Sequence, residues 1–275
     1  MKKLLLTGAN RGIGRALSEH FAKNPQLHSI LTVRDESKKK KLAEEMKTSG
    51  GSNVEVEVMD YSNKISVDAL IKVLKDKKHK LDYAILNSGI NISDKKKCDA
   101  AVAEETLKIN FDANMHIISS LLKENLLNNN AKVIQVSSYL GSIAQIKNED
   151  FKKKLQAAKT VSELKDLGKN YIELLKKKEL PQSQNVYNPE YSFSKLLVSL
   201  STPILQHDPK NRERNIQFYA MCPGWTKTDM GGPTAPNEVE SVIPKFDKLL
   251  SLPDSGEEAM GGMFFSQNRF SKISN

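Results

Sequence analysis

Tyr191 and Lys195 are four positions apart, and a phenol and an ammonium group at this spacing share one face of a helix. A nearby cation favours phenolate over phenol, so we expect Lys195 to lower the pKa of Tyr191 from its usual value of about 10. A tyrosine tuned in this way can donate a proton to a carbonyl oxygen as hydride arrives, or remove one in the reverse reaction. Lysine is abundant in this chain, so the spacing by itself also arises by chance.

Glycines near the N-terminus stand where a predicted strand passes into a predicted helix. Residues 1–6 are typical of a short buried strand, and Ile13, Leu17 and Phe21 then fall on one helical face. Such a turn offers free N–H groups and the positive end of a helix dipole, and glycine lets a phosphate approach the backbone. This context indicates a dinucleotide site. The spacing G-x-x-x-G-x-G matches only part of the G-x-G-x-x-G fingerprint, and a plain turn is the alternative.

Apolar strands alternate with helices along the rest of the chain. The expected helices span residues 37–48, 65–76 and 100–127, and the expected strands span residues 28–33, 54–59, 81–86, 132–136, 215–221 and 261–265. This alternation predicts an α/β fold with a doubly wound, parallel, Rossmann-like β-sheet flanked by helices. No linker rich in proline, glycine or serine divides the chain, so we expect a single domain over residues 1–275.

Arg34 ends the second predicted strand, 20 residues after Gly14, where an NAD-binding fold would place Asp or Glu for the ribose 2′-hydroxyl. An arginine suits a 2′-phosphate instead, and Arg11 in the glycine turn adds a second cation. Asp35 follows directly, so the charge pattern is mixed. The sequence favours NADP over NAD, and the alternative is an exposed charge without a ligand.

The candidate motifs follow one another in a fixed order. After the glycine turn come Asn87 and Ser138 at the ends of the fourth and fifth predicted strands, then Tyr191 and Lys195, and then Pro223-Gly224 after the sixth strand. This order resembles the short-chain dehydrogenase/reductase family over nearly the whole chain. It is most similar to the NADPH-dependent carbonyl reductase branch, which also has a long insert before the tyrosine and a stretch like residues 222–230.

The resemblance implies catalytic roles for four residues. Tyr191 would be the general acid, and Lys195 would bond the nicotinamide ribose and depress the tyrosine pKa. Ser138 would hydrogen-bond the carbonyl oxygen, and Asn110 would hold a water that connects Lys195 to bulk solvent. Without the family context, Ser138 could be a turn cap and Asn110 a satisfied polar group within a helix. The family glycine three positions after Asn110 is Ala113 here.

The resemblance also implies a cofactor site and a substrate site. Leu140 and Trp225 would contact substrate with Ser138 and Tyr191, and a loop over about residues 225–252 would cover the pocket; plain core packing is the alternative for Trp225. The segment after the fourth strand departs from the family motif N-N-A-G and matches directly only at Asn87. The implied cofactor contacts are Gly8, Asn10, Arg11, Gly12, Ile13, Gly14, Arg34, Asp60, Tyr61, Asn87, Ser88, Gly89, Tyr191, Lys195, Pro223, Gly224, Thr226 and Thr228.

A lysine-rich helical insert is expected over about residues 147–180, before Tyr191. Its candidate contact residues are Leu155, Leu164, Leu167, Leu174 and Leu175. Family relatives with such an insert tend to be monomers, so the resemblance implies a monomer whose inserted helices cover the surface that other members use for assembly.

Composition narrows the compartment and the partners. The net charge is +9, but the lysine runs have acidic neighbours and no interleaved aromatics, so we expect solvated faces and no nucleic-acid partner. The two cysteines, Cys98 and Cys222, are far apart, which favours a reducing compartment and a buried, apolar Cys222. No apolar run is long enough for a membrane span or a signal peptide, so we expect a cytoplasmic protein. The five histidines show no metal-ligand spacing, and we predict no metal.

We therefore expect an NADPH-dependent reductase that converts an aldehyde, ketone or quinone to an alcohol. A nucleotide-sensing binding protein with little chemistry is the second hypothesis. A nucleic-acid role suggested by the positive charge is the third, and a steep salt dependence of DNA retention would be its test.

Overall fold

An eight-stranded sheet forms the centre of the computed structural model, which describes residues 1–275 apart from 52, 94–98, 180–185, 255, 257–258 and 274–275. The strand order is β3-β2-β1-β4-β5-β6-β7-β8, and all neighbours are parallel except β7 and β8. This confirms the predicted doubly wound sheet, whose order reverses between β1 and β4. The strands span Lys2–Leu6 (β1), Leu27–Val33 (β2), Val54–Val58 (β3), Leu81–Leu86 (β4), Leu127–Val136 (β5), Gln217–Met221 (β6), Phe264–Ser266 (β7) and Arg269–Ser271 (β8).

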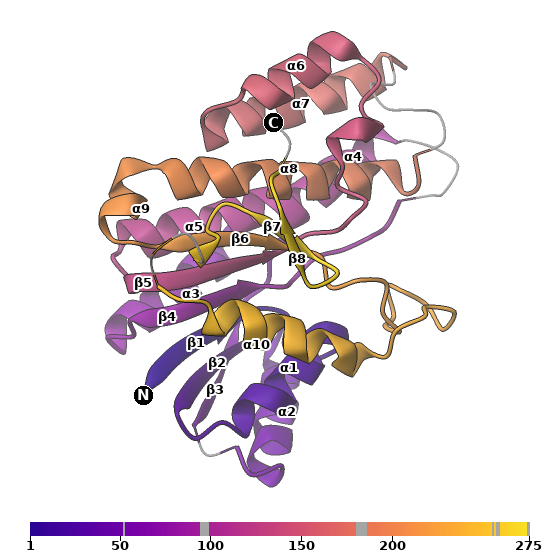
Figure 1. Cartoon of the computed structure of the whole chain (residues 1–275). Helices are drawn as coiled ribbons and strands as arrows, with labels where there is room; N and C mark the ends of the chain where they lie inside the picture. Colours follow the sequence, from indigo (N-terminus) through magenta and orange to yellow (C-terminus); the bar gives the residue numbers. More distant parts are fainter. Residues whose placement is uncertain (52, 94–98, 180–185, 255, 257–258, 274–275) are drawn as a thin grey trace.

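Two hydrophobic cores lie on opposite faces of the sheet. Leu5 and Val133 point into one core, whereas their neighbours Leu4 and Ile134 point into the other, as the two-residue period of a strand requires. The first core is covered by α3 (Lys64–Asp76), α4 (Ala100–Leu107), α5 (Ala113–Lys123) and α8 (Pro189–His207). The second is covered by α1 (Gly12–Ala22), α2 (Glu36–Thr48) and α10 (Ile243–Ser251) (Figure 1).

The predicted helix over residues 100–127 is interrupted and ends earlier. A π-helical turn, η1 (Lys108–Asp112), separates α4 from α5, and the N–H of Ala113 bonds to the carbonyl of Lys108, five residues back. From the start of α5, Asn114 Nδ2 donates to the carbonyl oxygen of Asn110 in this turn at 3.0 Å. After α5 the backbone turns through Asn125, whose φ is 52°, and Leu127 already belongs to β5. The apolar pattern predicted the helix but carried no signal for the wider turn.

Two helices, α6 (Glu149–Ala157) and α7 (Val161–Lys176), form the insert and lie outside α8 (Figure 1). Leu155 and Leu164 are buried, and the other three predicted contact leucines are partly buried against the same core. The ring of Tyr171 stacks on that of Phe193 in α8, with centroids 3.8 Å apart. The helical insert is therefore confirmed, although position 180, its predicted end, lies outside the described residues.

The sheet ends in a β-hairpin of β7 and β8, whereas the sequence predicted one last strand over residues 261–265. The strand is shifted to β7, and β8 returns antiparallel to it through Gln267 and Asn268, whose φ angles are 49° and 60°. Two residues with positive φ are typical of a tight hairpin turn, but the missed strand is too short for a periodic signal.

Shorter elements complete the fold: η2 (Ile143–Gln145), α9 (Pro209–Glu213) and η3 (Val239–Val242). Among the described residues, no helix combines the length and the apolar character that a membrane span needs.

Candidate active site

The glycine turn between β1 and α1 has no space for side chains. Gly8 and Gly12 have φ angles of 68° and 50°, which strongly favour glycine. A Cβ on Gly14 would stand 2.0 Å from the carbonyl oxygen of Gly8 and 2.8 Å from Asn87 Nδ2. The turn therefore presents bare backbone at the start of α1.

Thr7 connects this turn to the segments that follow β3 and β4. Its hydroxyl oxygen accepts hydrogen bonds from the backbone N–H of Asn87 at 2.9 Å, from that of Ser88 at 3.1 Å, and from the hydroxyl of Tyr61 at 2.9 Å. Burial raises the pKa of Tyr61, so this phenol remains a donor. Thr7 was absent from the predicted contacts, although it directly precedes Gly8, the first glycine of the turn.

Substitution of Gly14 by alanine is expected to destabilise the turn and to abolish nucleotide binding. An added methyl group must displace the backbone of Gly8, and overpacking of this kind costs about 1–3 kcal/mol of unfolding free energy. Thermal unfolding and NADPH titration of the purified variant would measure both effects. Gly168→Ala is a suitable control because Gly168 lies inside α7, and an added Cβ would come no closer than 3.4 Å to a neighbouring side chain; equal nucleotide affinity in the two variants would contradict the prediction.

The two arginines predicted to contact phosphates of the cofactor, Arg34 and Arg11, are exposed. Arg34 follows β2 and has no hydrogen-bond or ion-pair partner among the described residues, whereas Arg11 pairs with Asp229 at 3.5 Å. Both side chains of that pair are largely exposed, so it contributes little stability. A depression of about 550 Å³ opens beside Gly12 and Arg11, and Thr228 also lines it.

The predicted Tyr–Lys pair lies on α8, which begins with Pro189 at its first position, where proline fits a helix. Lys195 Nζ lies 5.6 Å from the centroid of the Tyr191 ring and donates a hydrogen bond to the carbonyl oxygen of Val136 at 2.7 Å. The end of β5 therefore holds the ammonium group beneath the phenol. The prediction that Tyr191 and Lys195 lie on one face of a helix agrees with the structure.

The expected fall in the pKa of Tyr191 is wrong for this structure. Burial raises the pKa of Tyr191 to about 12 and outweighs a hydrogen bond from Ser138 that lowers it. Burial also lowers the pKa of Lys195 to about 8, because the ammonium group has lost water and donates its hydrogen bond to a neutral carbonyl, that of Val136. Spacing alone predicted the partner but could not predict how deeply both groups are buried.

Ser138 reaches the phenol from the segment after β5. Its hydroxyl also accepts a hydrogen bond from the backbone N–H of Leu140 at 3.2 Å. A Cβ on Gly141 would lie 2.6 Å from the backbone carbon of Lys195, so this segment packs directly on α8. Cys222 at the end of β6 is buried, as predicted, and its sulfur accepts from the N–H of Tyr139 at 3.2 Å.

Asn110 lies in the π-helical turn and is fully buried. Its side chain holds Ile90, with Nδ2 donating to the Ile90 carbonyl at 2.9 Å and Oδ1 accepting from the Ile90 N–H at 2.8 Å. A Cβ on Gly89 would lie 3.1 Å from Asn110 Oδ1 and 3.5 Å from Lys195 Nζ. Asn110 therefore fixes the segment after β4 against the lysine.

The remaining predicted residues stand in the segments that follow the strands. Asp60 Oδ1 accepts hydrogen bonds from Ser62. Asn87 Nδ2 donates to the carbonyl of Thr7 at 3.0 Å. Asn10 and Ile13 lie in the glycine turn and the start of α1, and Pro223, Gly224 and Thr226 follow β6.

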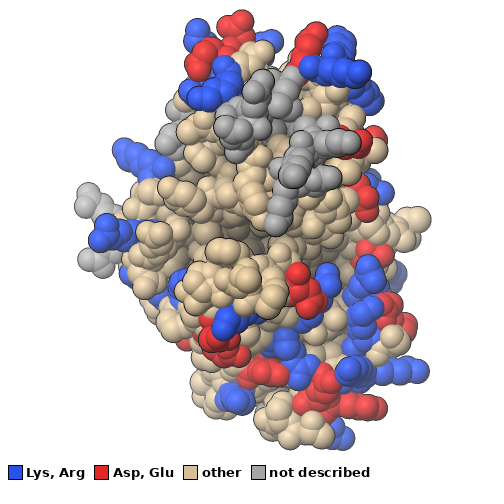
Figure 2. Space-filling model, turned by 90° about the vertical axis from the view of Figure 1, so that its right-hand side faces the viewer, with Lys and Arg blue, Asp and Glu red and all other residues tan. Residues whose placement is uncertain are grey.

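Large apolar side chains are exposed around this site. Trp225 is 57% exposed, which excludes core packing, and its Nε1 donates to the carbonyl of Gly231 at 2.7 Å. Figure 2 shows the face with the strand ends: its centre is uncharged and hollowed, and charged side chains lie around it. An exposed apolar patch of this kind is typical of a ligand site. The large apolar side chains exposed on the segments that follow β4, β5 and β6 and that precede α8 are Ile92, Tyr139, Leu140, Tyr187, Trp225 and Met230, and we call them the apolar patch.

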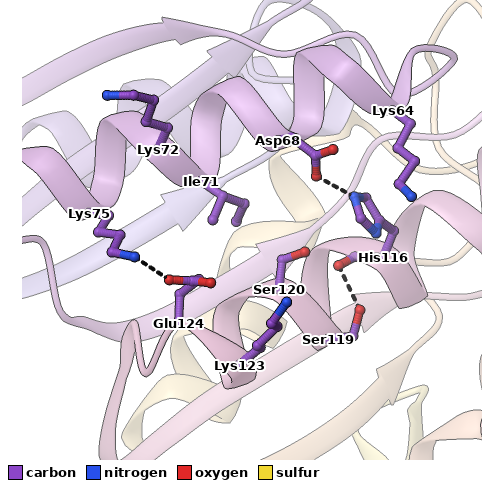
Figure 3. Close-up of a pocket in the computed structure, with 10 residues that line it drawn as sticks. All are labelled: Lys64, Asp68, Ile71, Lys72, Lys75, His116, Ser119, Ser120, Lys123 and Glu124. Carbon is purple, nitrogen blue, oxygen red and sulfur yellow. Dashed lines mark hydrogen bonds and ion pairs between the residues drawn. The ribbon is translucent and has the colours of Figure 1, made fainter.

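A second depression, of about 520 Å³, lies between α3 and α5 (Figure 3). Four of its polar side chains form two pairs: His116 with Asp68 at 2.6 Å and Lys75 with Glu124 at 2.6 Å. None of the predicted site residues lines it.

The fold and the glycine turn define the class of protein. The family model for short chain dehydrogenases matches residues 2–150, and the chain belongs to this family.

Within the family, the chain is 31% identical over 264 residues to carbonyl reductase (NADPH) 3 of Rattus norvegicus, covering 94% of this chain and 93% of that protein. It is 28% identical over 272 residues to carbonyl reductase (NADPH) 1 of Bos taurus, covering 96% of each. Salutaridine reductase from Papaver somniferum shares the fold, with a TM-score of 0.84 at 22% identity, covering 97% of this chain and 100% of that one. The predicted likeness to the carbonyl reductase branch is confirmed.

Proposed function

We propose that this protein uses NADPH to reduce the carbonyl group of an aldehyde, ketone or quinone to an alcohol. The observation that carries the proposal is the meeting of Tyr191, Ser138 and Lys195 at the edge of the sheet that also carries the glycine turn. Similarity to NADPH carbonyl reductases over 94% of the chain supports both the cofactor and the substrate class.

Tyr191 is the proton donor in this proposal. Burial keeps its phenol protonated at neutral pH, which is the form that can donate to a carbonyl oxygen. Ser138 donates a second hydrogen bond to the same oxygen and stabilises the negative charge that develops there. The ammonium group of Lys195 favours the phenolate that remains after the proton has left.

The residues of the turn fit a dinucleotide. Gly8, Gly12 and Gly14 leave bare backbone at the positive end of α1, where a pyrophosphate is favoured. NADPH, when bound, supplies the hydride. Arg34, exposed and unpaired among the described residues, is available for its 2′-phosphate, and Lys195 for its nicotinamide ribose.

Replacing Arg34 by alanine is expected to raise the KM for NADPH roughly tenfold to a hundredfold, because a hydrogen bond to a charged group contributes about 1.5–3 kcal/mol. The KM for NADH should stay unchanged, since NADH lacks the 2′-phosphate. Arg212→Ala, which removes an exposed arginine on α9, is the control. An equal rise for both nucleotides would assign Arg34 a general structural role instead.

The direct test is NADPH consumption over a panel of quinones, aldehydes and diketones. Turnover of at least one class, with formation of the alcohol, supports the reductase. The second hypothesis, a nucleotide-sensing protein, predicts tight NADPH binding without consumption of any panel member.

The proposed substrate site is the apolar patch with Ser138, Leu140, Tyr191 and Trp225, covered by the loop over residues 225–252. We further propose that the protein is a monomer, since α7 packs against both α4 and α8 and covers their outer surfaces. We also propose a cytoplasmic location and no nucleic-acid partner, on the grounds of composition and charge pattern. A tetramer in a sizing measurement would contradict the monomer.

A further inference from the structure

We propose that His28, Glu55 and His79 form a binding site for a divalent transition-metal ion, with Zn²⁺ as the best match. The side chains meet at the opposite end of the sheet from Tyr191, and their ligand atoms all lie within 4.8 Å of one another. They are far apart in the sequence, so histidine spacing gave no sign of them and the prediction of no metal rested on that spacing.

The distances resemble those between the ligands of one tetrahedral ion. Zn²⁺ binds nitrogen and oxygen at 2.0–2.2 Å, which places neighbouring ligands of a tetrahedron about 3.3 Å apart. Glu55 Oε1 lies 2.9 Å from His28 Nε2 and 3.2 Å from His79 Nε2. Three such ligands leave a fourth position for water, and imidazole with carboxylate suits zinc better than magnesium or calcium.

The ligands are held by regular structure near the amino ends of neighbouring strands. His28 is the second residue of β2, Glu55 is the second residue of β3, and the two strands are paired in parallel. His79 precedes β4, and its N–H bonds to the carbonyl of Leu74 in α3 at 2.8 Å. Its side chain is only 7% exposed, and those of His28 and Glu55 are 17% and 26% exposed. The site is therefore partly dehydrated but open to water.

Two lysines determine how strongly an ion binds. Lys77 Nζ donates to Glu55 Oε2 at 2.7 Å, which orients the carboxylate and leaves Oε1 toward the histidines. Lys3 Nζ lies 2.9 Å from His79 Nδ1. An ion on Nε2 would require the ring to carry its proton on Nδ1, so Lys3 has to turn away. Lys3 is therefore a competitor for the ion.

The bound ion would tie β2, β3 and the start of β4 together at the end of the sheet that lacks the catalytic residues. Its expected effect is on stability and not on turnover. This separates the site from the reductase proposal, because either can fail without the other.

The test uses the full chain, stripped of metal by chelation and titrated with ZnCl₂ in calorimetry and thermal unfolding. We expect one Zn²⁺ per chain with a rise in Tm. His79→Gln and Glu55→Gln should each weaken binding by more than the roughly 10–100-fold that follows loss of an outer-shell partner. Lys3→Met should tighten it about tenfold by removing a like charge close to the ion. A merely structural cluster does not predict this gain.

His20→Gln is the matched control, since His20 also pairs with a carboxylate, Asp247 at 2.9 Å, but has no second histidine. It should leave Zn²⁺ binding unchanged, and circular dichroism would verify that each variant is folded. If the stripped protein takes up no Zn²⁺, or if a folded His28→Gln/His79→Gln double variant binds it equally well, the site does not exist. Absence of any tightening in Lys3→Met would also count against it.

Discussion

Tyr191→Phe is expected to lower kcat by about 10²–10⁴-fold, the range that a positioned general acid contributes. The variant loses the hydroxyl that donates to the carbonyl oxygen but keeps the ring, whose centroid lies 5.6 Å from Lys195 Nζ. NADPH affinity should therefore change little. Steady-state turnover of the best panel substrate, together with NADPH titration by fluorescence, would measure the two quantities separately.

Tyr83→Phe provides the control for this experiment. Tyr83 is buried in β4, and its hydroxyl accepts a hydrogen bond from Lys2 Nζ at 2.7 Å. This part of the sheet carries none of the predicted site residues. Its removal should leave kcat unchanged. Turnover by Tyr191→Phe at the rate of the natural protein would disprove the role of Tyr191 as proton donor.

Lys195→Met is expected to lower kcat by roughly 10²–10³-fold, the effect of removing one preorganised electrostatic group from an active site. Because burial lowers the pKa of Lys195 to about 8, the lysine is charged below this pH and neutral above it. In the natural protein kcat/KM for NADPH should therefore fall as the pH rises through about 8. In Lys195→Met this alkaline fall should disappear, because methionine does not titrate.

Lys132→Met is the matched control for the pH profile. Lys132 is also buried and its pKa is also lowered by burial, but it lies in β5 and donates to the carbonyl of Leu250 at 3.1 Å. The alkaline fall should persist in this variant. If it persists in Lys195→Met as well, another group causes it.

Local patterns in the sequence predicted most elements, because strand and helix periods depend on neighbouring residues. Ile13, Leu17 and Phe21 predicted α1, and the apolar runs predicted the strands of the doubly wound sheet. The same reasoning missed the π-helical turn around Asn110 and the strand β8. The π-helical turn shifts the helix by only one residue, and β8 has only three residues, so neither produces a hydrophobic periodicity that can be detected.

The order of motifs was also sufficient to predict the edge of the sheet at which the candidate site lies. Parallel strands end on one side, so Ser138, Asn87 and the glycine turn had to meet there once the alternation was recognised. The role of Thr7 was not predicted, because the three hydrogen bonds that its hydroxyl accepts come from residues that are distant in sequence.

The sequence by itself therefore determined the class of fold, the family and the identity of the candidate catalytic residues, since these depend on residue type and chain order. Only the tertiary structure decided the direction of the Tyr191 pKa, because burial raises this pKa and outweighs the hydrogen bond from Ser138. It likewise brought His28, Glu55 and His79 together. Desolvation and long-range contact depend on how the chain packs, and no spacing along the chain encodes them.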